Sequence, residues 1–452
     1  MKDELYRPAS PFRRALLAAA LLPLTLSSGA QSLRWPGQAQ TAPAPAPSAM
    51  PARTNYATPG RALAPASSFD VRQFEAMAQQ LVAGQRVPGL AMAIVQNGRV
   101  LSARGYGITD TRAAEPVDAH TVFRLASLSK GFAGTMTGML VNEGALRWDS
   151  KLTDFLPGFR LLDPYAAQRV TIADVLSHRI GLTHNTYDRD LEANADYPNL
   201  VQRLAYAPLT CPPGSCYSYQ NIAFSLIGDV VFAATGSFYG QAVDRRLFKP
   251  LGMNDASVGL DGILGSPRWA RPHVRAGGGW TSLTPKPTYY RVAPAAGVNA
   301  SAADMAQWLI AQTGHRPDVL PAPLLATLHS PLVPTPGETR ASKWRRERVF
   351  SAGYGLGWRV YDYAGRRLVF HGGAVQGYRG VIALLPERDL GIALLWNSDS
   401  SLPSGLLPTV LDSAIGLPKQ RWLDVDVVDD MMLSESTTSP GADSSQSSAR
   451  PN

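Results

Sequence analysis

The chain has 452 residues, of which 45% are hydrophobic and 17% are charged, so it can bury one large core or two closely packed lobes. Its net charge of +8 comes without a basic run interleaved with aromatic residues, which favours a solvated surface over a nucleic-acid-binding one. The two cysteines form no CxxC motif and no histidine cluster accompanies them, which argues against a zinc or redox site.

The first 30 residues have the pattern of a secretory signal peptide. Basic residues precede an apolar segment over 15–26, and Ser28-Gly29-Ala30 predicts cleavage after Ala30. A membrane anchor is the alternative, but this apolar segment contains Pro23 and is shorter than the roughly 20 residues that a spanning helix needs. Arg13-Arg14 leaves the twin-arginine route of export open. We therefore expect a periplasmic or secreted protein with no integral membrane segment after signal removal.

The Pro/Ala-rich residues 31–67 predict an extended linker ahead of the folded domain. Asp70 is suited to cap a helix whose apolar residues recur on one face up to Gly84. Two apolar segments then surround Asn97-Gly98, a dipeptide typical of hairpin turns. The predicted strands of this hairpin are residues 90–96 and 99–106.

Ser127 precedes Lys130 by three residues at the start of a predicted helix, so both side chains lie on one helix face. A serine hydroxyl is a weak nucleophile, and a lysine can accept its proton when burial or nearby charge lowers the amine pKa toward about 7 to 8. The small and apolar residues 131–141, which end before Gly144, would supply that burial. The pair alone is a weak signal, because a surface helix can carry one by chance.

Residues 145 to about 290 show no sustained alternation and predict a lobe made mostly of helices and loops. Within this lobe, Cys211 and Cys216 enclose Pro-Pro-Gly-Ser. In an exported chain this spacing favours a disulfide that closes a tight loop, and two unpaired buried thiols are the alternative.

Strand patterns return late in the chain, at residues 357–362, 367–370, 379–385 and 390–396. Apolar runs such as 381–385 are typical of strands that are covered on both faces. We expect one antiparallel sheet with strands from both ends of the chain. The first helix and the late helices would cover one face, and the Ser127 helix the other. The folded domain is expected to span 68–423, followed over 424–452 by an acidic and then Ser-rich disordered tail.

Three motifs occur in the order found in one enzyme family: Ser127-x-x-Lys130, Tyr219-Gln220-Asn221 before an apolar helix, and His371-Gly372-Gly373 at a late strand. The sequence thereby resembles the serine β-lactamase and penicillin-recognising D,D-peptidase superfamily, in its class C, carboxypeptidase and esterase-like branch. The resemblance covers about residues 85–400. It implies an α/β (α+β) serine β-lactamase-like fold, with an antiparallel sheet flanked by helices and a mostly helical inserted lobe. Supporting similarities lie at residues 174–182, 297–308 and 354–358.

The resemblance implies acyl transfer with no cofactor and no metal. Ser127 would attack an acyl carbonyl, Lys130 would take the hydroxyl proton, and Tyr219 would relay a proton to the leaving group. Tyr217 is an alternative for the catalytic phenol, although Asn221 leads correctly into the helix only in the first assignment.

The remaining motif residues are expected to bind the substrate. Asn221 can donate to a substrate amide and accept from the catalytic lysine. His371 would lie beside the cleft, and Gly372-Gly373 would let the substrate lie against bare strand backbone. The backbone N–H groups of Ala374 and of the nucleophile would form the oxyanion hole.

Two residues depart from the family pattern. Ile180 replaces a serine in a histidine-bearing turn, where His178 and His184 are expected to be structural. His371 stands where efficient class C β-lactamases usually carry the lysine of Lys-Thr-Gly, and we expect it to be partly charged near neutral pH. This replacement argues against potent antibiotic hydrolysis and favours D-amino-acid peptides or simple esters.

We therefore expect an exported serine hydrolase that acts through an acyl-enzyme on D-Ala-type peptide, β-lactam or ester carbonyls. A penicillin-binding sensor that acylates and then deacylates very slowly is the alternative. A catalytically silent scaffold is disfavoured because all three motifs are intact. The partner would be a small-molecule or peptide substrate, and the sequence leaves the oligomeric state open.

Overall fold

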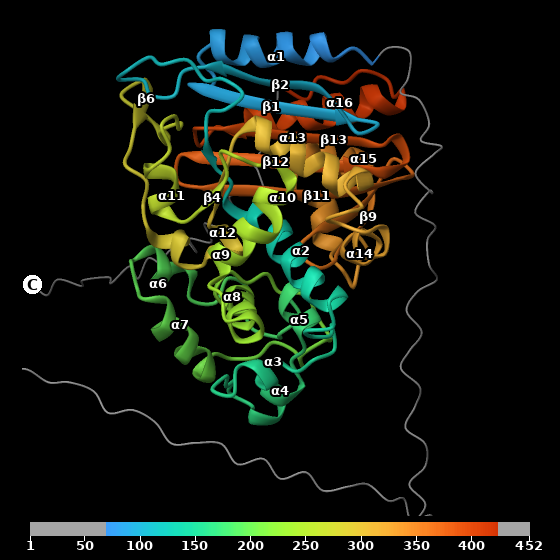
Figure 1. Cartoon of the computed structure of the whole chain (residues 1–452). Helices are drawn as coiled ribbons and strands as arrows, with labels where there is room; N and C mark the ends of the chain where they lie inside the picture. The colour runs from blue at the N-terminus through green and yellow to red at the C-terminus, as the bar shows by residue number, and fades with distance from the viewer. Residues whose placement is uncertain (1–68, 424–452) are drawn as a thin grey trace, which may run out of the picture. The chain divides into compact units, whose positions relative to one another are not determined.

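The computed structural model describes residues 69–423; the predicted signal peptide, linker and tail lie outside these residues. Eight antiparallel strands form one sheet in the order β2-β1-β13-β12-β11-β10-β9-β8 (Figure 1). The strands are β1 (Gly89–Gln96), β2 (Arg99–Gly107), β8 (Val333–Pro334), β9 (Val349–Tyr354), β10 (Arg359–Tyr363), β11 (Arg366–Val375), β12 (Tyr378–Leu385) and β13 (Leu390–Trp396).

The sheet joins the two ends of the folded region, as the sequence predicts, because β1 pairs with β13. Asn97 and Gly98 both have positive φ angles, 50° and 68°, as a type I′ hairpin turn requires. The predicted strand at Gly357 begins two residues later, since Gly357 itself turns with a φ of 85°. Strand β11 runs beyond its predicted end at Phe370 and contains the whole third motif.

Helices cover both faces of the sheet, as expected. Asp70 caps α1 (Val71–Ala83), which packs with α16 (Leu406–Ile415) on one face. Helices α2 (Ser129–Asn142) and α13 (Ala302–Ile310) pack on the other. Alternate residues of β1 point to the two cores, and fully burying one such aliphatic side chain contributes roughly 1.5–3 kcal/mol.

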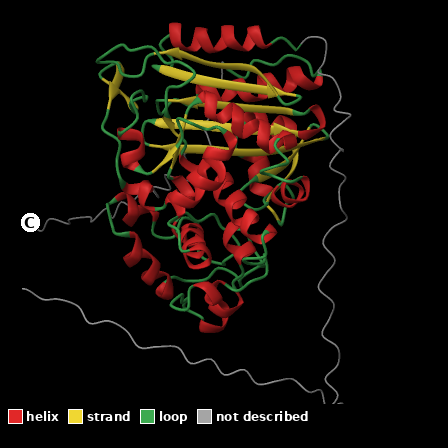
Figure 2. Ribbon diagram, in the orientation of Figure 1, coloured by secondary structure: helices red, strands yellow, loops and turns green. Residues whose placement is uncertain are grey.

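The lobe is mostly helical, as predicted, and lies beside the sheet (Figure 2). The sequence missed the short strands in and around the lobe, because two to four residues are too few to show alternation. Helices of the lobe and its surroundings are α3 (Leu152–Phe155), α4 (Pro164–Arg169), α5 (Ile172–Leu176), α6 (Asp188–Glu192), α7 (Tyr197–Arg203), α8 (Ile222–Thr235), α9 (Tyr239–Val243), α10 (Lys249–Leu251), α11 (Leu260–Leu264) and α12 (Ala293–Ala296). The short strands are β3 (Phe123–Arg124), β4 (Ser257–Val258), β5 (His273–Ala276), β6 (Gly279–Ser282) and β7 (Val298–Ala300). The remaining helices are α14 (Ala322–Leu328) and α15 (Lys343–Arg348).

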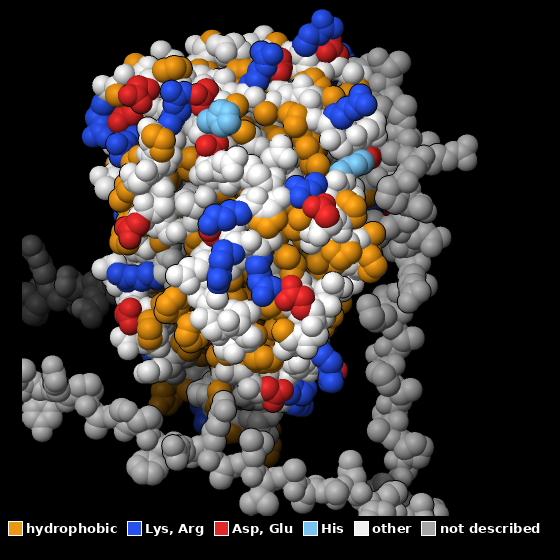
Figure 3. All heavy atoms as spheres, in the orientation of Figure 1, with side chains coloured by type: hydrophobic (Ala, Val, Ile, Leu, Met, Phe, Trp, Pro, Cys, Tyr) orange, Lys and Arg blue, Asp and Glu red, His pale blue; other side chains and the backbone are white. Residues whose placement is uncertain are grey.

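On the face shown in Figure 3, basic and acidic side chains are interspersed rather than gathered by sign. Within residues 69–423, no single helix has the length and hydropathy to cross a membrane. Helix α8 and the following segment Tyr239–Leu251 meet the criteria of length and composition only as a pair bent by 73°.

Candidate active site

The predicted nucleophile lies in a buried segment that leaves it accessible. Ser127 is in a 3₁₀ turn, η1 (Ala126–Leu128), directly before α2. Across residues 121–138, every residue except Ser127 is buried. Ala126 has a φ of 49°, a left-handed conformation that costs a non-glycine residue roughly 1–2 kcal/mol. Sequence reasoning did not reveal this strained residue, which sets the direction of the chain into Ser127.

The Lys130 side chain is fully buried and reaches the Ser127 hydroxyl, as the helical spacing predicts. Its Nζ donates to Ser127 Oγ at 3.5 Å, to Asn221 Oδ1 at 2.6 Å and to the carbonyl oxygen of Ala295 at 3.2 Å. The Tyr219 ring lies 4.5 Å from the same nitrogen. Two of the predicted motifs therefore meet at one amine.

The tyrosine and asparagine of the second motif are positioned by the histidine-bearing turn. The backbone N–H of Gln220 donates to His178 Nδ1 at 3.1 Å, so this nitrogen is an acceptor and is unprotonated. Burial is the main reason that the pKa of His178 lies well below its usual value. A neutral, buried His178 fits the structural role expected from the sequence. The geometry favours Tyr219 over Tyr217 as the phenol beside Lys130, and its catalytic role stays a prediction.

The third motif lies directly against the nucleophile turn. A Cβ atom on Gly373 would come within 2.5 Å of the Leu125 carbonyl oxygen and 3.1 Å of the Ser127 backbone nitrogen. Only glycine allows β11 to approach η1 this closely. The contact brings the backbone of Gly373 and Ala374 beside Ser127, an arrangement compatible with the predicted oxyanion hole.

His371 is placed differently from the sequence expectation. It is 1% exposed, its Nδ1 donates to the Gly372 carbonyl at 2.7 Å, and its Nε2 accepts from the Tyr354 hydroxyl at 3.0 Å. Burial, together with the cations Arg359 and Lys130, holds the pKa of His371 well below its ordinary value. The expected partial charge near neutral pH is therefore wrong, because a desolvated imidazole between two cations stays neutral.

Asp188 is a member of the site that sequence reasoning missed. Its Oδ2 accepts from Asn221 Nδ2 at 2.6 Å and from the Tyr289 hydroxyl at 3.4 Å. The Tyr289 hydroxyl also donates to Glu192 Oε1 at 2.9 Å. Burial raises the pKa of Asp188 to about 6. An aspartate that begins a helix ordinarily suggests a surface cap, so the sequence carried no signal of this contact.

Two cavities adjoin these residues, and His184 lines both. One, of about 350 Å³, is also lined by Asp188 and Glu192. The other, of about 540 Å³, is lined by Tyr219 and by Arg359, which forms an ion pair with Glu338. One cavity therefore has carboxylates in its lining, and the other contains the ion pair of Arg359 and Glu338.

The predicted disulfide is present between Cys211 and Cys216. Its loop is attached to the histidine-bearing turn, because Gly214 N–H donates to the Arg179 carbonyl at 2.7 Å. Arg179 in turn forms an ion pair with Asp174 at 2.8 Å. The bridge therefore closes a loop that leads directly into the second motif.

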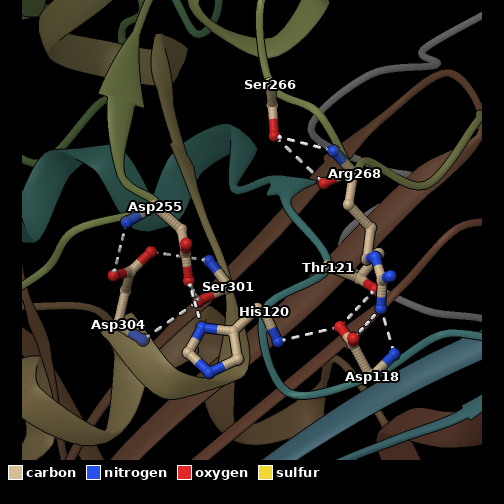
Figure 4. Close-up of polar contacts among 8 residues, drawn as sticks. All are labelled: Asp118, His120, Thr121, Asp255, Ser266, Arg268, Ser301 and Asp304. Carbon is tan, nitrogen blue, oxygen red and sulfur yellow. Dashed lines mark hydrogen bonds and ion pairs between the residues drawn. The ribbon is translucent and has the colours of Figure 1, made fainter.

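A cluster of serine, histidine and aspartate lies outside the three motifs; it was not predicted, and it is not a rival active site. Figure 4 shows His120 and Ser301 on the same carboxylate of Asp255. His120 Nδ1 lies 2.9 Å from Asp255 Oδ2, and Ser301 Oγ donates to that oxygen at 2.8 Å. Because the serine donates to the carboxylate, His120 is not placed to take its proton. Ser301 instead caps α13 together with Asp304.

Comparison with known proteins gives one family over most of the chain. The family model described as Beta-lactamase matches residues 74–414. Penicillin-binding protein 4 of Amycolatopsis lactamdurans is 28% identical over 73% of this chain and 86% of its own length. Unguisins hydrolase ungD' of Aspergillus campestris (strain IBT 28561) is 24% identical over 75% of this chain, which spans 64% of that protein. An octameric penicillin-binding protein homologue from Pyrococcus abyssi has a similar fold, with a TM-score of 0.67, 24% identity, and coverage of 77% of this chain and 78% of that one.

Proposed function

Since the chain belongs to the β-lactamase family, we propose that it is a serine hydrolase that forms an acyl-enzyme on Ser127. One observation carries the proposal: a fully buried Lys130 amine donates to the hydroxyl of the one accessible residue in its segment. Asn221 and the Tyr219 ring hold the amine in that position.

The proposed reaction begins when Ser127 Oγ attacks an acyl carbonyl and Lys130 takes the hydroxyl proton. The carbonyl electron pair moves to oxygen, where the backbone N–H groups of Ser127 and Ala374 would stabilise it. Tyr219 would relay the proton to the leaving group as the bond to the acyl carbon breaks. Water then attacks the acyl carbon, the bond from that carbon to Ser127 Oγ breaks, and Oγ takes up a proton from the water as the acid leaves.

We infer that esters without a carboxylate are better substrates than β-lactams, which carry one. The support is the neutral state of His371, which leaves the third motif without the fixed cation that a lysine would supply. D-Ala-type peptides, β-lactams and esters share the acyl carbonyl that the reaction needs, so all three belong in the test.

The test compares the mature chain with Ser127→Ala and with the control Ser129→Ala, whose hydroxyl accepts from Val298 N–H within the core. Initial rates are measured with nitrophenyl esters, D-Ala peptides and a β-lactam. We expect a burst followed by steady turnover in the parent and the control, and loss of both in Ser127→Ala. A burst without turnover would identify the slow sensor, and activity that persists in Ser127→Ala would move the site elsewhere.

We also propose export to the periplasm or the medium. The support is the predicted signal peptide over residues 1–30 and the Cys211–Cys216 disulfide, a bond typical of oxidising compartments. Cell fractionation with N-terminal sequencing should find a mature chain that starts at Gln31. A chain that keeps its first residues in the cytoplasm would contradict export.

A further inference from the structure

The contact between Asp188 and Asn221 gives the aspartate a role in the proposed reaction. Asp188 is the first residue of α6 and follows Tyr187, which has a φ of 64°. Its carboxylate is buried, and Oδ2 lies 2.6 Å from Asn221 Nδ2. On the other side of the same amide, Asn221 Oδ1 lies 2.6 Å from Lys130 Nζ.

A side-chain amide can face a neighbour with either its donor or its acceptor end. Lys130 needs an acceptor, and an amide turned by 180° would present the NH₂ group to the amine instead. A carboxylate accepts and does not donate, so it admits only the NH₂ end of Asn221. We propose that Asp188 is a positioning residue that fixes the amide of Asn221, and through it places the Lys130 amine beside Ser127.

The groups that face Asp188 fix the pH range in which this role operates. They are Asn221 and Tyr289, which donate to it, Lys130, whose charge favours its anion, and Glu192, whose charge opposes it. Burial outweighs the favourable contacts and raises the pKa of Asp188 to about 6. Above that pH the group is an anion that accepts only. Below it, the group carries a hydroxyl and holds the amide less strongly.

Asp304 provides a matched control. It is also a buried carboxyl whose pKa burial raises to about 6, and it lies in the first turn of another helix, α13. Its partners are the backbone of Ser301 and of Asp255, outside the catalytic motifs. A general loss of stability or of buried charge would affect variants at both positions, whereas loss of the amide contact would affect Asp188 alone.

The inference rests on the proposed hydrolase activity, so the parent chain must first hydrolyse a nitrophenyl ester. The test measures kcat and KM from pH 4.5 to 9 for Asp188→Asn, Asp188→Leu and Asp304→Asn. Leucine has a similar volume and no acceptor, and asparagine keeps an acceptor and removes the charge. Thermal unfolding of each variant reports whether it is folded.

We expect Asp188→Leu to lower the alkaline plateau of kcat by about 100-fold with little change in KM, because a base misplaced by about 1 Å loses that much rate. Asp188→Asn should keep kcat within about tenfold of the parent and move its acidic limb about one unit lower. Two effects move the limb to lower pH. The variant lacks the carboxyl group that titrates, and it also lacks the anion that favours the ammonium form of Lys130. Asp304→Asn should match the parent.

An unchanged plateau in Asp188→Leu, or an equal loss in Asp304→Asn, would overturn the inference and leave the proposed hydrolase intact. If Asp188→Leu does not fold, the pH profile of Asp188→Asn decides, and a limb identical to that of the parent would overturn the inference. A parent chain without ester hydrolysis would instead contradict the proposed function.

Discussion

Lys130 is the residue on which the proposed chemistry depends. A buried ammonium is costly unless polar groups surround it, and Asn221, Ala295 and the Tyr219 ring do so here. These groups are neutral, so they hold the amine in place and stabilise its charged form less than a direct carboxylate contact would. Such surroundings suit a side chain that must accept and return one proton.

Tyr219→Phe should test the proton relay at this residue. Removing the hydroxyl leaves the ring beside Lys130 and deletes a general acid, so kcat should fall by about 10²–10⁴-fold with KM nearly unchanged. Tyr217→Phe is the matched variant and should keep most of the parent's kcat. Steady-state ester hydrolysis measures both. A large loss of kcat in Tyr217→Phe but not in Tyr219→Phe would instead assign the proton relay to Tyr217.

The neutral state of His371 changes the pH dependence expected from the sequence. A charged imidazole would favour carboxylate-bearing substrates at low pH and lose them as pH rises through about 6.5. Because the pKa of His371 lies well below that value, the group is neutral on both sides of pH 6.5. The ratio of kcat/KM for a carboxylate-bearing ester and a neutral ester should therefore stay constant from pH 5.5 to 8. A ratio that falls as pH rises in the parent but not in His371→Gln would show that His371 is charged at low pH and attracts the carboxylate.

At the scale of elements, the site depends on how closely β11 approaches η1. Gly373 has no side chain, and the atoms around its Cα leave no room for one. The same contact places the strand backbone beside Ser127, so strand position and oxyanion stabilisation are linked.

Gly373→Ala should separate folding from catalysis. The added methyl group would meet the Leu125 carbonyl, so β11 must move away from η1 and kcat should fall by about 10²-fold or more. Gly279→Ala is a control in another strand, where an added Cβ meets nothing within 4 Å. Ester hydrolysis and circular dichroism follow both variants. A folded Gly373→Ala with full activity would refute the link between strand position and catalysis.

The disulfide belongs to the same scale, because it closes one loop. In the chain-entropy model, a bridge across so short a loop contributes about 2 kcal/mol to stability. Replacing Cys211 and Cys216 together by serine should lower the free energy of unfolding by that amount, as measured in urea. An unchanged midpoint of unfolding would show that the bridge adds nothing to the stability of the folded chain.

The elements that carry the catalytic motifs were predictable because their signals are local. Ser127 and Lys130 are one helical turn apart, and Asn97-Gly98 specifies its own turn. Contacts between distant segments were not predictable, since the Asp188 to Asn221 bond joins the start of α6 to the residue before α8. The charge of His371 was predicted wrongly for a related reason: burial by Tyr354 and proximity to Arg359 exist only in the folded chain.

For the folded region as a whole, the site draws its parts from three layers. The proposed nucleophile comes from the turn before α2, the glycines come from β11 in the sheet, and Tyr219, Asn221 and Asp188 come from the lobe. Two large apolar cores, one on each face of the sheet, hold these layers in place. The proposed catalysis therefore requires that the lobe and the sheet keep a fixed position relative to each other.

The most direct test of the account is intact-mass spectrometry with peptide mapping. The mature chain is mixed with a slowly deacylated ester or β-lactam, quenched in acid and digested. We predict a mass increase equal to one acyl group, located on the peptide that contains Ser127 and absent from Ser127→Ala. Turnover of the same substrate with the acyl group on another residue, or with no acyl-enzyme at all, would contradict the account.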